Sequence, residues 1–262
     1  MDWQDFEINT TKYLNDTYGN SSLVFIHEGG FDSCKPDIYV YRDEDNIFNI
    51  ECKFKKSQSS QFVLLEDPSN KTFSFSSKNK SNEDDAEELI IHVNQNYDYY
   101  SKKKSTNRRN NKLICDQDII NNYIVKNLSR KSSIIITSDF TNNFSDSKPL
   151  TISKIVDIPI NYNTTGTYRT KQSGTRNANN NDIRLLNLET EKINNKIFVC
   201  DPDQKLNSYQ DNNVFLSKVN SDGLREVRKR SKTYNSNIIF SLSLNDEAKI
   251  HTPKCFLSDI LI

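Results

Sequence analysis

The stretch "KPDIYVYRDEDNIFNIECKFKKSQSSQF", residues 35–62, decides the fold because it joins two apolar strands through a polar turn. Residues 37–42 and 46–54 alternate between apolar and polar side chains, which is typical of strands, and the turn at residues 43–46 favours a hairpin. In the second strand Glu51 and Lys53 share the polar face. An antiparallel return brings Asp37, at the start of the first strand, opposite Glu51 within about one residue of register.

Two carboxylates and an ammonium at one sheet edge have the composition of a phosphodiesterase site. Mg²⁺ prefers carboxylate oxygens and keeps most of its waters, so Asp37 and Glu51 are the predicted metal ligands. Lys53 can orient the attacking water and stabilise it as it loses a proton, and Gln61 can hydrogen-bond the water or a phosphate. A Glu and a Lys two residues apart are equally typical of a solvated sheet face, and this alternative stays open.

The N-terminal segment predicts a helix that begins after Asp2 as the N-cap and runs to Tyr18, with Gly19 as a left-handed stop. Its apolar stripe is formed by Trp3, Phe6, Tyr13 and Leu14. Glu7 falls about 40° from Trp3 on this wheel, so its carboxylate should point into the protein and need a partner. Alternatively, Glu7 packs its stem at the edge of the stripe and keeps its carboxylate in water.

Further along the chain the patterns predict strands and helices in alternation. Residues 61–67 and 71–77 favour a second hairpin, and residues 83–100 favour a helix with His92 exposed. Residues 101–112 are the best candidate for a linker or loop. A further helix is expected at 116–128, and later strands at 132–138, 196–200, 213–219 and 236–244.

Composition limits the class of protein. The 262 residues favour two or three compact units, and 34% hydrophobic residues with a mean hydropathy of -0.76 lie at the polar end of what still buries a core. The net charge is zero, which argues against a uniformly basic nucleic-acid coat but allows local basic stretches such as residues 102–131 and 218–232. Five widely spaced cysteines and no signal or membrane segment predict a cytoplasmic protein without disulfides or structural zinc.

The Pro36-Asp37 pair before one strand and the Glu51-x-Lys53 triplet in the next resemble the PD-(D/E)xK nuclease superfamily. The resemblance implies an α+β fold with a mixed five-stranded sheet and flanking helices, followed by further small mixed-sheet domains. A leading helix in this superfamily often adds a glutamate near the metal, and Glu7 would fill that place.

Four blocks in order resemble HhaI-like type II restriction endonucleases, and the similarity extends to about residue 244. The blocks are "DWQDFEINTTKYLNDTYGN", "IECKFKKSQSSQFVL", "TYRTKQSGTRN" and "YNSNIIFSLSL". The chain departs from these relatives at Pro36, where they have Ser, at Cys52, where they have Ala, and in its longer hairpin loop. Residues 107–150 match poorly.

The resemblance implies a Mg²⁺-dependent restriction enzyme that cuts double-stranded DNA at a short symmetric G/C site, with GCGC suggested, and leaves 5′-phosphate and 3′-hydroxyl ends. It further implies a monomer that nicks the strands in turn and a cognate DNA methyltransferase as functional partner. Three parts are expected: a catalytic domain at 1–105, a sequence-recognition domain at 106–190 and an additional DNA-binding domain at 191–262. A junction resolvase, a nonspecific nuclease and a catalytically dead DNA-binding protein are the alternatives.

The block "TYRTKQSGTRN" is the expected base-reading segment because Arg and Lys can engage the O6 and N7 acceptors of guanine in the major groove. A tight turn at the Ser-Gly pair would let the backbone approach a groove closely. The candidate DNA-binding residues are Arg169, Lys171, Ser173, Gly174, Arg176 and Asn177. A basic hairpin that contacts phosphates only is the alternative. Arg228, Arg230 and Lys232 are candidates for phosphate contacts or for a solvated face.

Overall fold

The computed structural model of the chain describes residues 2–30, 34–102, 111–172, 174–184, 189–201, 203, 214–230 and 234–246. The chain divides into two compact units. The first joins the chain up to Arg169 with the strand that resumes at Asn237, and the second comprises Thr170–Ser236. These units do not coincide with the three expected segments, whose boundaries stay predictions.

The N-terminal helix α1 spans Trp3–Tyr18 and begins as predicted, because the Asp2 carboxylate accepts a hydrogen bond of 3.0 Å from the Gln4 N–H. The predicted stripe is wrong at Trp3, whose side chain is 42% exposed. The predicted left-handed stop at Gly19 is also wrong, since its φ of -64° and ψ of 147° are extended. A Cβ there would lie 2.5 Å from the Asn15 carbonyl oxygen, so the position needs glycine for close approach rather than for its φ.

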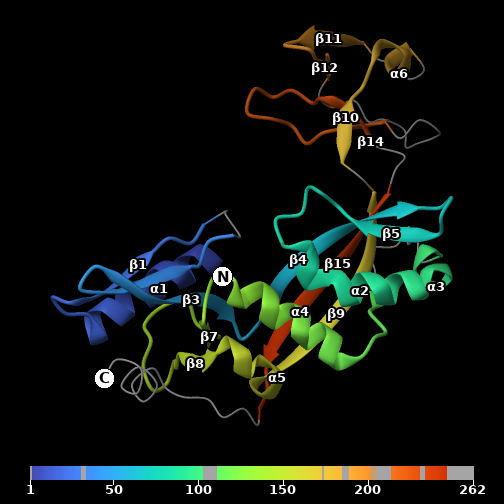
Figure 1. Cartoon of the computed structure of the whole chain (residues 1–262). Helices are drawn as coiled ribbons and strands as arrows, with labels where there is room; N and C mark the ends of the chain where they lie inside the picture. The colour runs from blue at the N-terminus through green and yellow to red at the C-terminus, as the bar shows by residue number, and fades with distance from the viewer. Residues whose placement is uncertain are drawn as a thin grey trace. The chain divides into compact units, whose positions relative to one another are not determined.

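The first sheet has five strands in the order β1-β2-β3-β7-β8. Their bounds are Leu23–His27, Ile38–Arg42, Asp45–Phe54, Ile134–Ser138 and Thr151–Lys154. The β3–β7 pair is parallel and the other pairs are antiparallel, so the sheet is mixed, as the superfamily resemblance implied. Figure 1 shows α1 lying along this sheet, where it packs on β1 and β3.

The hairpin between β2 and β3 turns at Asp43 and Glu44, both with positive φ, as a two-residue hairpin loop requires. Its register pairs Ile38 with Ile50, so Asp37 lies next to Glu51 as expected. The apolar face of the sheet and α1 bury one core. Its fully buried members are Phe6, Leu14, Leu23, Phe25, Ile38, Val40, Ile50, Cys52, Ile134, Ile136, Leu150 and Ile152.

The second sheet also has five strands, in the order β5-β4-β15-β9-β6. In that order their bounds are Thr72–Phe75, Lys56–Asp67, Tyr234–Leu244, Tyr162–Gln172 and Asn111–Lys112. Helices α2 (Glu83–Gln95) and α4 (Gln117–Ser129) bury their apolar faces in the same core as this sheet. The predicted hairpin of residues 61–77 is confirmed as the antiparallel β4–β5 pair.

Short helices complete the first unit. The helix predicted for residues 83–100 is interrupted, because α2 ends at Gln95 and α3 spans Tyr97–Ser101. The Asn96 side chain donates to the His92 carbonyl at 2.9 Å and closes α2. His92 is half-buried rather than exposed, with its Nε2 3.2 Å from the Tyr100 hydroxyl. A 3-10 turn η1 (Ile155–Asp157) leads into α5 (Ile158–Asn161).

The second unit contains two small sheets. One has the order β10-β14-β13, with bounds Thr175–Asn177, Val227–Arg230 and Val214–Leu216. The other pairs β11 (Thr190–Ile193) with β12 (Lys196–Val199), and a short helix α6 spans Asn180–Arg184. The core of this unit is formed by Ala178, Ile197, Val199 and Val227.

None of the helices in the described residues combines the length and the apolar character needed to span a bilayer. The four described cysteines, Cys34, Cys52, Cys115 and Cys200, are free thiols. Ser173, Lys232 and Cys255, together with most of the expected linker at 101–112, lie outside the described residues.

Candidate active site

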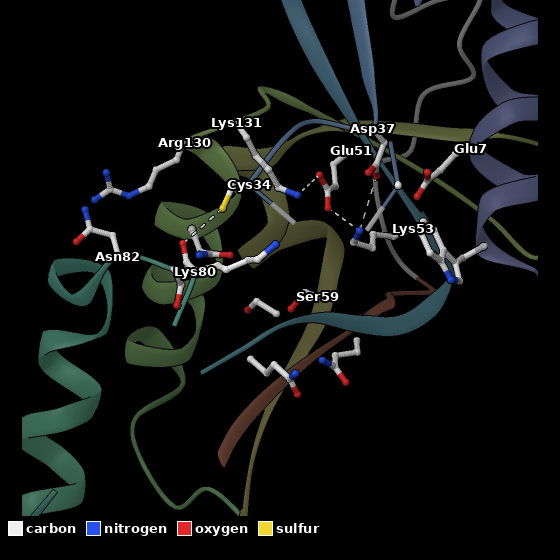
Figure 2. A pocket seen from close by; sticks show the side chains of 17 residues that line it. Glu7, Cys34, Asp37, Glu51, Lys53, Ser59, Lys80, Asn82, Arg130 and Lys131 are labelled. Atoms are coloured by element: carbon white, nitrogen blue, oxygen red, sulfur yellow. Dashed lines mark hydrogen bonds and ion pairs between the residues drawn. The ribbon is translucent and has the colours of Figure 1, made fainter. Parts of the chain in front are cut away.

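A cavity of about 560 Å³ opens in the first unit where β3 and the residue before β2 face β4 and the end of α4. One wall carries the predicted carboxylates and Lys53, and the other carries hydroxyl, amide and cationic side chains (Figure 2). The sequence-predicted residues that line it are Glu7, Asp37, Glu51, Lys53 and Gln61. The structure therefore brings together all five residues that sequence reasoning selected for the catalytic site.

Asp37 is fixed by the backbone of the neighbouring strand. Its N–H donates to the Ile50 carbonyl at 3.2 Å, and its carboxylate Oδ2 accepts from the Cys52 N–H at 2.7 Å. The side chain is 11% exposed. Burial raises the pKa of Asp37; Lys53 lowers it and Glu51 raises it further, and the net shift is upward. Burial is therefore the largest cause of the raised pKa of Asp37.

Glu51 lies between two ammonium groups. Its Oε1 is 2.5 Å from Lys53 Nζ, and its Oε2 is 2.7 Å from Lys131 Nζ. The carboxylate is 1% exposed. Burial opposes its ionisation, but the charges of Lys53 and Lys131 outweigh burial, so the pKa of Glu51 is lowered. Glu51 is therefore ionised at neutral pH.

Lys53 Nζ lies between the two carboxylates, 2.5 Å from Glu51 and 3.8 Å from Asp37. Burial alone would lower the pKa of Lys53, but the charges on Glu51 and Asp37 outweigh it and raise the pKa above its ordinary value. Lys53 therefore keeps its proton. It can donate hydrogen bonds and stabilise negative charge, and it is not a general base in this arrangement.

Glu7 points from α1 into the same cavity and is 4% exposed, which confirms the inward orientation predicted from the helical wheel. Its Oε2 is 3.3 Å from His27 Nε2. Burial, and next the charge on Asp37, raise the pKa of Glu7 to about 8. A Cβ at Gly29 would lie 2.2 Å from Glu7 Oε2, so glycine at that position makes room for the carboxylate.

The opposite wall comes from β4, from the segment before α2, and from the end of α4 with the residues that follow it. Gln61 is exposed on β4 and lines the cavity, while the next residue, Phe62, points into the core. The wall also includes Gln58, Ser59, Ser60, Lys80, Ser81, Asn82, Asn127, Arg130 and Lys131. Apart from Lys131, whose Nζ is paired with Glu51, these are hydroxyl, amide and cationic donors of the kind that proteins direct at phosphate oxygens.

The donor set fits a hard divalent cation held by two carboxylates. In the described part of the chain no three His, Cys, Asp or Glu side chains form a metal-binding group by themselves. Mg²⁺ does not require three, because it is usually bound by one or two carboxylates together with waters and substrate phosphates. The Lys53 ammonium between Asp37 and Glu51 shows that this pair of carboxylates already stabilises a positive charge.

Sequence reasoning missed Lys131, His27 and Gly29. Lys131 lies just after α4, in a basic stretch that composition alone describes as a solvated surface. The inward position of His27 could have been predicted from the sequence, because His27 lies two residues after Phe25 in β1 and therefore shares its face, which faces α1. Gly29 follows β1 in a polar segment, and no pattern in the sequence distinguishes it from a turn glycine.

The expected base-reading residues do not form one described group. Arg169 ends the first unit on β9 and is half-buried, whereas Gly174, Arg176 and Asn177 belong to the second unit. Arg176 and Asn177 are exposed on β10. Ser173 and the side chain of Lys171 lie outside the described part of the structure. A DNA-binding role for these six residues stays a prediction.

The strand beside β10 is also basic. In the β10–β14 pair, Arg176 lies opposite Lys229 and Asn177 opposite Arg228. Lys229 is paired with Asp182, and Arg230 lies over the Phe215 ring at 5.1 Å. The pairing and stacking hold part of this basic surface in place.

Comparison with known proteins gives one full-length likeness. No family model and no curated protein matches the chain. A solved structure of HhaI endonuclease in complex with DNA matches it with a TM-score of 0.64 and 26% sequence identity, over 100% of each chain. This confirms the resemblance to HhaI-like endonucleases and the mixed α+β fold.

Proposed function

We propose that this chain, which resembles HhaI endonuclease in fold and shares 26% sequence identity with it, is a restriction endonuclease that acts on double-stranded DNA. The observation that carries the proposal is the convergence of Asp37, Glu51 and Lys53 on one cavity of the first unit. A solvated sheet face does not explain this convergence, because its Glu and Lys side chains would be exposed, whereas Glu51 is 1% exposed. A buried carboxylate is costly unless it is paired, and here it is paired with Lys53.

Mg²⁺ is the proposed cofactor, with Asp37 and Glu51 as the side chains that would hold it. When bound there, it supplies positive charge for the phosphoryl and leaving oxygens of the scissile phosphodiester. The geometry supports this assignment, because the Asp37 and Glu51 carboxylates already lie 3.8 and 2.5 Å from one positive charge, Lys53 Nζ.

The proposed reaction is hydrolysis of a phosphodiester. The oxygen of a water forms the new bond to phosphorus, and the bond between phosphorus and the 3′ oxygen breaks. The attacking water gives up a proton and the leaving 3′ oxygen takes one up, so the products carry a 3′-hydroxyl and a 5′-phosphate. Lys53, whose ammonium keeps its proton, orients the attacking water and stabilises the negative charge that develops as the water loses a proton.

Glu7 and Gln61 have supporting roles in this proposal. Glu7 approaches the catalytic group from α1, and its pKa of about 8 means that it adds no full negative charge at neutral pH in the metal-free protein. Gln61 lines the cavity from β4 and can donate from its amide to the water or to a phosphate.

Sequence discrimination is assigned to Arg169, Lys171, Ser173, Gly174, Arg176 and Asn177. The exposed Arg176 and Asn177 support the assignment, since neither side chain is buried in the second unit. Arginine bonds both major-groove acceptors of guanine, which suits a short symmetric G/C site such as GCGC. A monomeric enzyme with a cognate methyltransferase completes the proposal.

Plasmid digestion tests this function directly. Purified protein is incubated with plasmid in Mg²⁺ or in EDTA, and the ends of the products are sequenced. Discrete fragments that share one symmetric G/C tetranucleotide at their ends, formed in Mg²⁺ alone, are expected. A smear indicates a nonspecific nuclease, and cleavage confined to four-way junctions indicates a resolvase; either result contradicts the proposal.

A catalytically dead DNA-binding protein is the remaining alternative. It predicts that DNA is shifted on a gel but is not cut under any divalent cation. The intact Asp37, Glu51 and Lys53 count against it, because a binding protein has no need to bury these charges together.

A further inference from the structure

We propose that Lys131 is a positioning residue of the catalytic site, which holds the Glu51 carboxylate in the orientation that binds the divalent cation. The inference rests on the proposed function and adds to it a residue far from the hairpin motif. Lys131 follows α4, whose last residue is Ser129.

The backbone of Lys131 is fixed on both sides. Its N–H donates to the Leu128 carbonyl at 3.2 Å, and its carbonyl accepts from the Asn49 side chain at 3.0 Å. The preceding residue, Arg130, makes two hydrogen bonds of 2.6 and 2.8 Å to Asp85 on α2. The end of α4 is therefore tied to both β3 and α2, and Lys131 starts from a defined position.

The side chain of Lys131 reaches from this position to both arms of the hairpin. Its Nζ is 2.7 Å from Glu51 Oε2 and 3.5 Å from the carbonyl oxygen of Lys35, which precedes Pro36 and Asp37. The side chain is 13% exposed, so the contact is shielded from water. Figure 2 shows Lys131 and Lys53 approaching Glu51 from different sides.

The two oxygens of Glu51 therefore have different partners. Lys131 holds Oε2, whereas Oε1 is directed to the space that Glu51 shares with Asp37, where Lys53 Nζ now lies. A carboxylate with one oxygen held in a buried ion pair, 2.7 Å from an ammonium nitrogen, cannot rotate freely. Such outer partners of metal ligands typically contribute 10- to 100-fold in metal affinity or activity.

A simple neutralising role for Lys131 makes the opposite prediction. If Lys131 only offset the charge of Glu51, its removal would leave a more negative site and strengthen cation binding. If Lys131 positions Glu51, its removal weakens cation binding despite the favourable change in charge. The sign of the change in affinity therefore separates the two roles.

The test measures binding of Mn²⁺ alone to the DNA-free full chain, by the electron paramagnetic resonance signal of the free ion. The variants are Lys131→Met, which removes the charge at similar length, and Lys131→Arg, which keeps it. Lys126→Met is the matched control, because Lys126 is half exposed on α4 and lies 3.9 Å from Glu88. Asp37→Asn identifies the binding that belongs to the catalytic site.

Lys131→Met should weaken the Asp37-dependent Mn²⁺ binding by about 10- to 100-fold. Lys131→Arg should recover part of the loss, and Lys126→Met should bind as the wild type does. Unchanged or tighter binding by Lys131→Met overturns the inference, and so does a wild type without Asp37-dependent binding. If Lys131→Met does not fold, Lys131→Ala, which also removes the contact with Glu51, is measured with the same two outcomes.

Cleavage of DNA separates this inference from the proposed function. Lys131→Met should reduce kcat at saturating Mg²⁺ and leave DNA affinity in EDTA unchanged. A wild type that cuts no DNA contradicts the proposed function, whatever the Mn²⁺ result. A wild type that cuts while Lys131→Met cuts and binds Mn²⁺ equally well contradicts the positioning role of Lys131 alone.

Discussion

The Asp37 carboxylate accepts a hydrogen bond of 2.7 Å from the backbone N–H of Cys52, on the strand that carries Glu51 and Lys53. A side chain at the start of β2 is thereby fixed to the backbone of β3, between the other two charged residues of the candidate site. The register of the β2–β3 hairpin therefore also sets the positions of Asp37, Glu51 and Lys53 relative to one another. The proposed activity consequently depends on local strand pairing that the sequence encodes in residues 35–54.

Two substitutions at Asp37 separate its charge from its hydrogen bond. Asp37→Asn keeps an oxygen that can accept from Cys52, whereas Asp37→Ala leaves that buried N–H without a partner. Urea unfolding should show Asp37→Ala less stable than Asp37→Asn by about 1 to 3 kcal/mol. Both variants should lose DNA cleavage. Equal stabilities would show that the bond to Cys52 contributes little.

The stability of the metal-free protein should depend on pH through Glu7. Burial and the Asp37 charge raise the pKa of Glu7 from 4.5 to about 8. Between these values the folded protein binds a proton that the unfolded chain has lost, so wild-type stability falls as the pH rises through this window. The Glu7→Gln variant has no carboxyl group that titrates at this position, so its stability should not show this decrease.

Urea unfolding in EDTA at pH 5.5 and pH 8.5 measures the effect. The stability of Glu7→Gln relative to wild type should increase from the lower to the higher pH by on the order of 1 to 3 kcal/mol. A relative stability that stays constant between the two pH values would show that Glu7 titrates alike in the folded and unfolded states.

Gly174 should matter for DNA binding and not for folding. A Cβ at this position would meet no atom within 4 Å in the described structure. Gly174→Ala should therefore leave the Tm unchanged and weaken specific DNA binding by about tenfold, or about 1.4 kcal/mol, if the backbone approaches a groove closely. Fluorescence anisotropy with a duplex containing the site measures the affinity. Wild-type affinity would argue against close backbone approach at Gly174.

Arg176 and Arg230 should affect DNA binding in different ways. Arg176 is exposed on β10, whereas Arg230 lies over the Phe215 ring. Arg176→Ala should cost about 1 to 3 kcal/mol of discrimination between the site and a duplex with one G·C pair replaced. Arg230→Ala should weaken binding to both duplexes alike. Equal losses in Arg176→Ala would reassign Arg176 to phosphate contact.

The local parts of the fold could be predicted from the sequence. The hairpin of β2 and β3 follows from alternation and a polar turn, and the burial of Glu7 follows from its angle on α1. Even so, Trp3 is exposed at one end of the predicted stripe, because a helical wheel gives a direction and not the extent of the surface that covers it.

The non-local parts could not be predicted. The parallel pairing of β3 with β7 joins Glu51 to Ile135, and no sequence pattern specifies such a partner. Because Lys131 lies shortly before β7, the pairing of β3 with β7 also brings Lys131 close to Glu51. The strand β15, which returns to the sheet of β4 and β9 near the end of the chain, is a further long-range pairing.

The central claim is that Lys53 acts with Asp37 and Glu51 on a DNA phosphate, and single-turnover cleavage of a short GCGC duplex in Mg²⁺ tests it most directly. Lys53→Met is compared with Lys56→Met, a control at an exposed lysine three residues further along. Lys53→Met should slow cleavage by at least about 100-fold without a change in DNA affinity in EDTA, and Lys56→Met should cut normally. Wild-type cleavage by Lys53→Met would contradict the account.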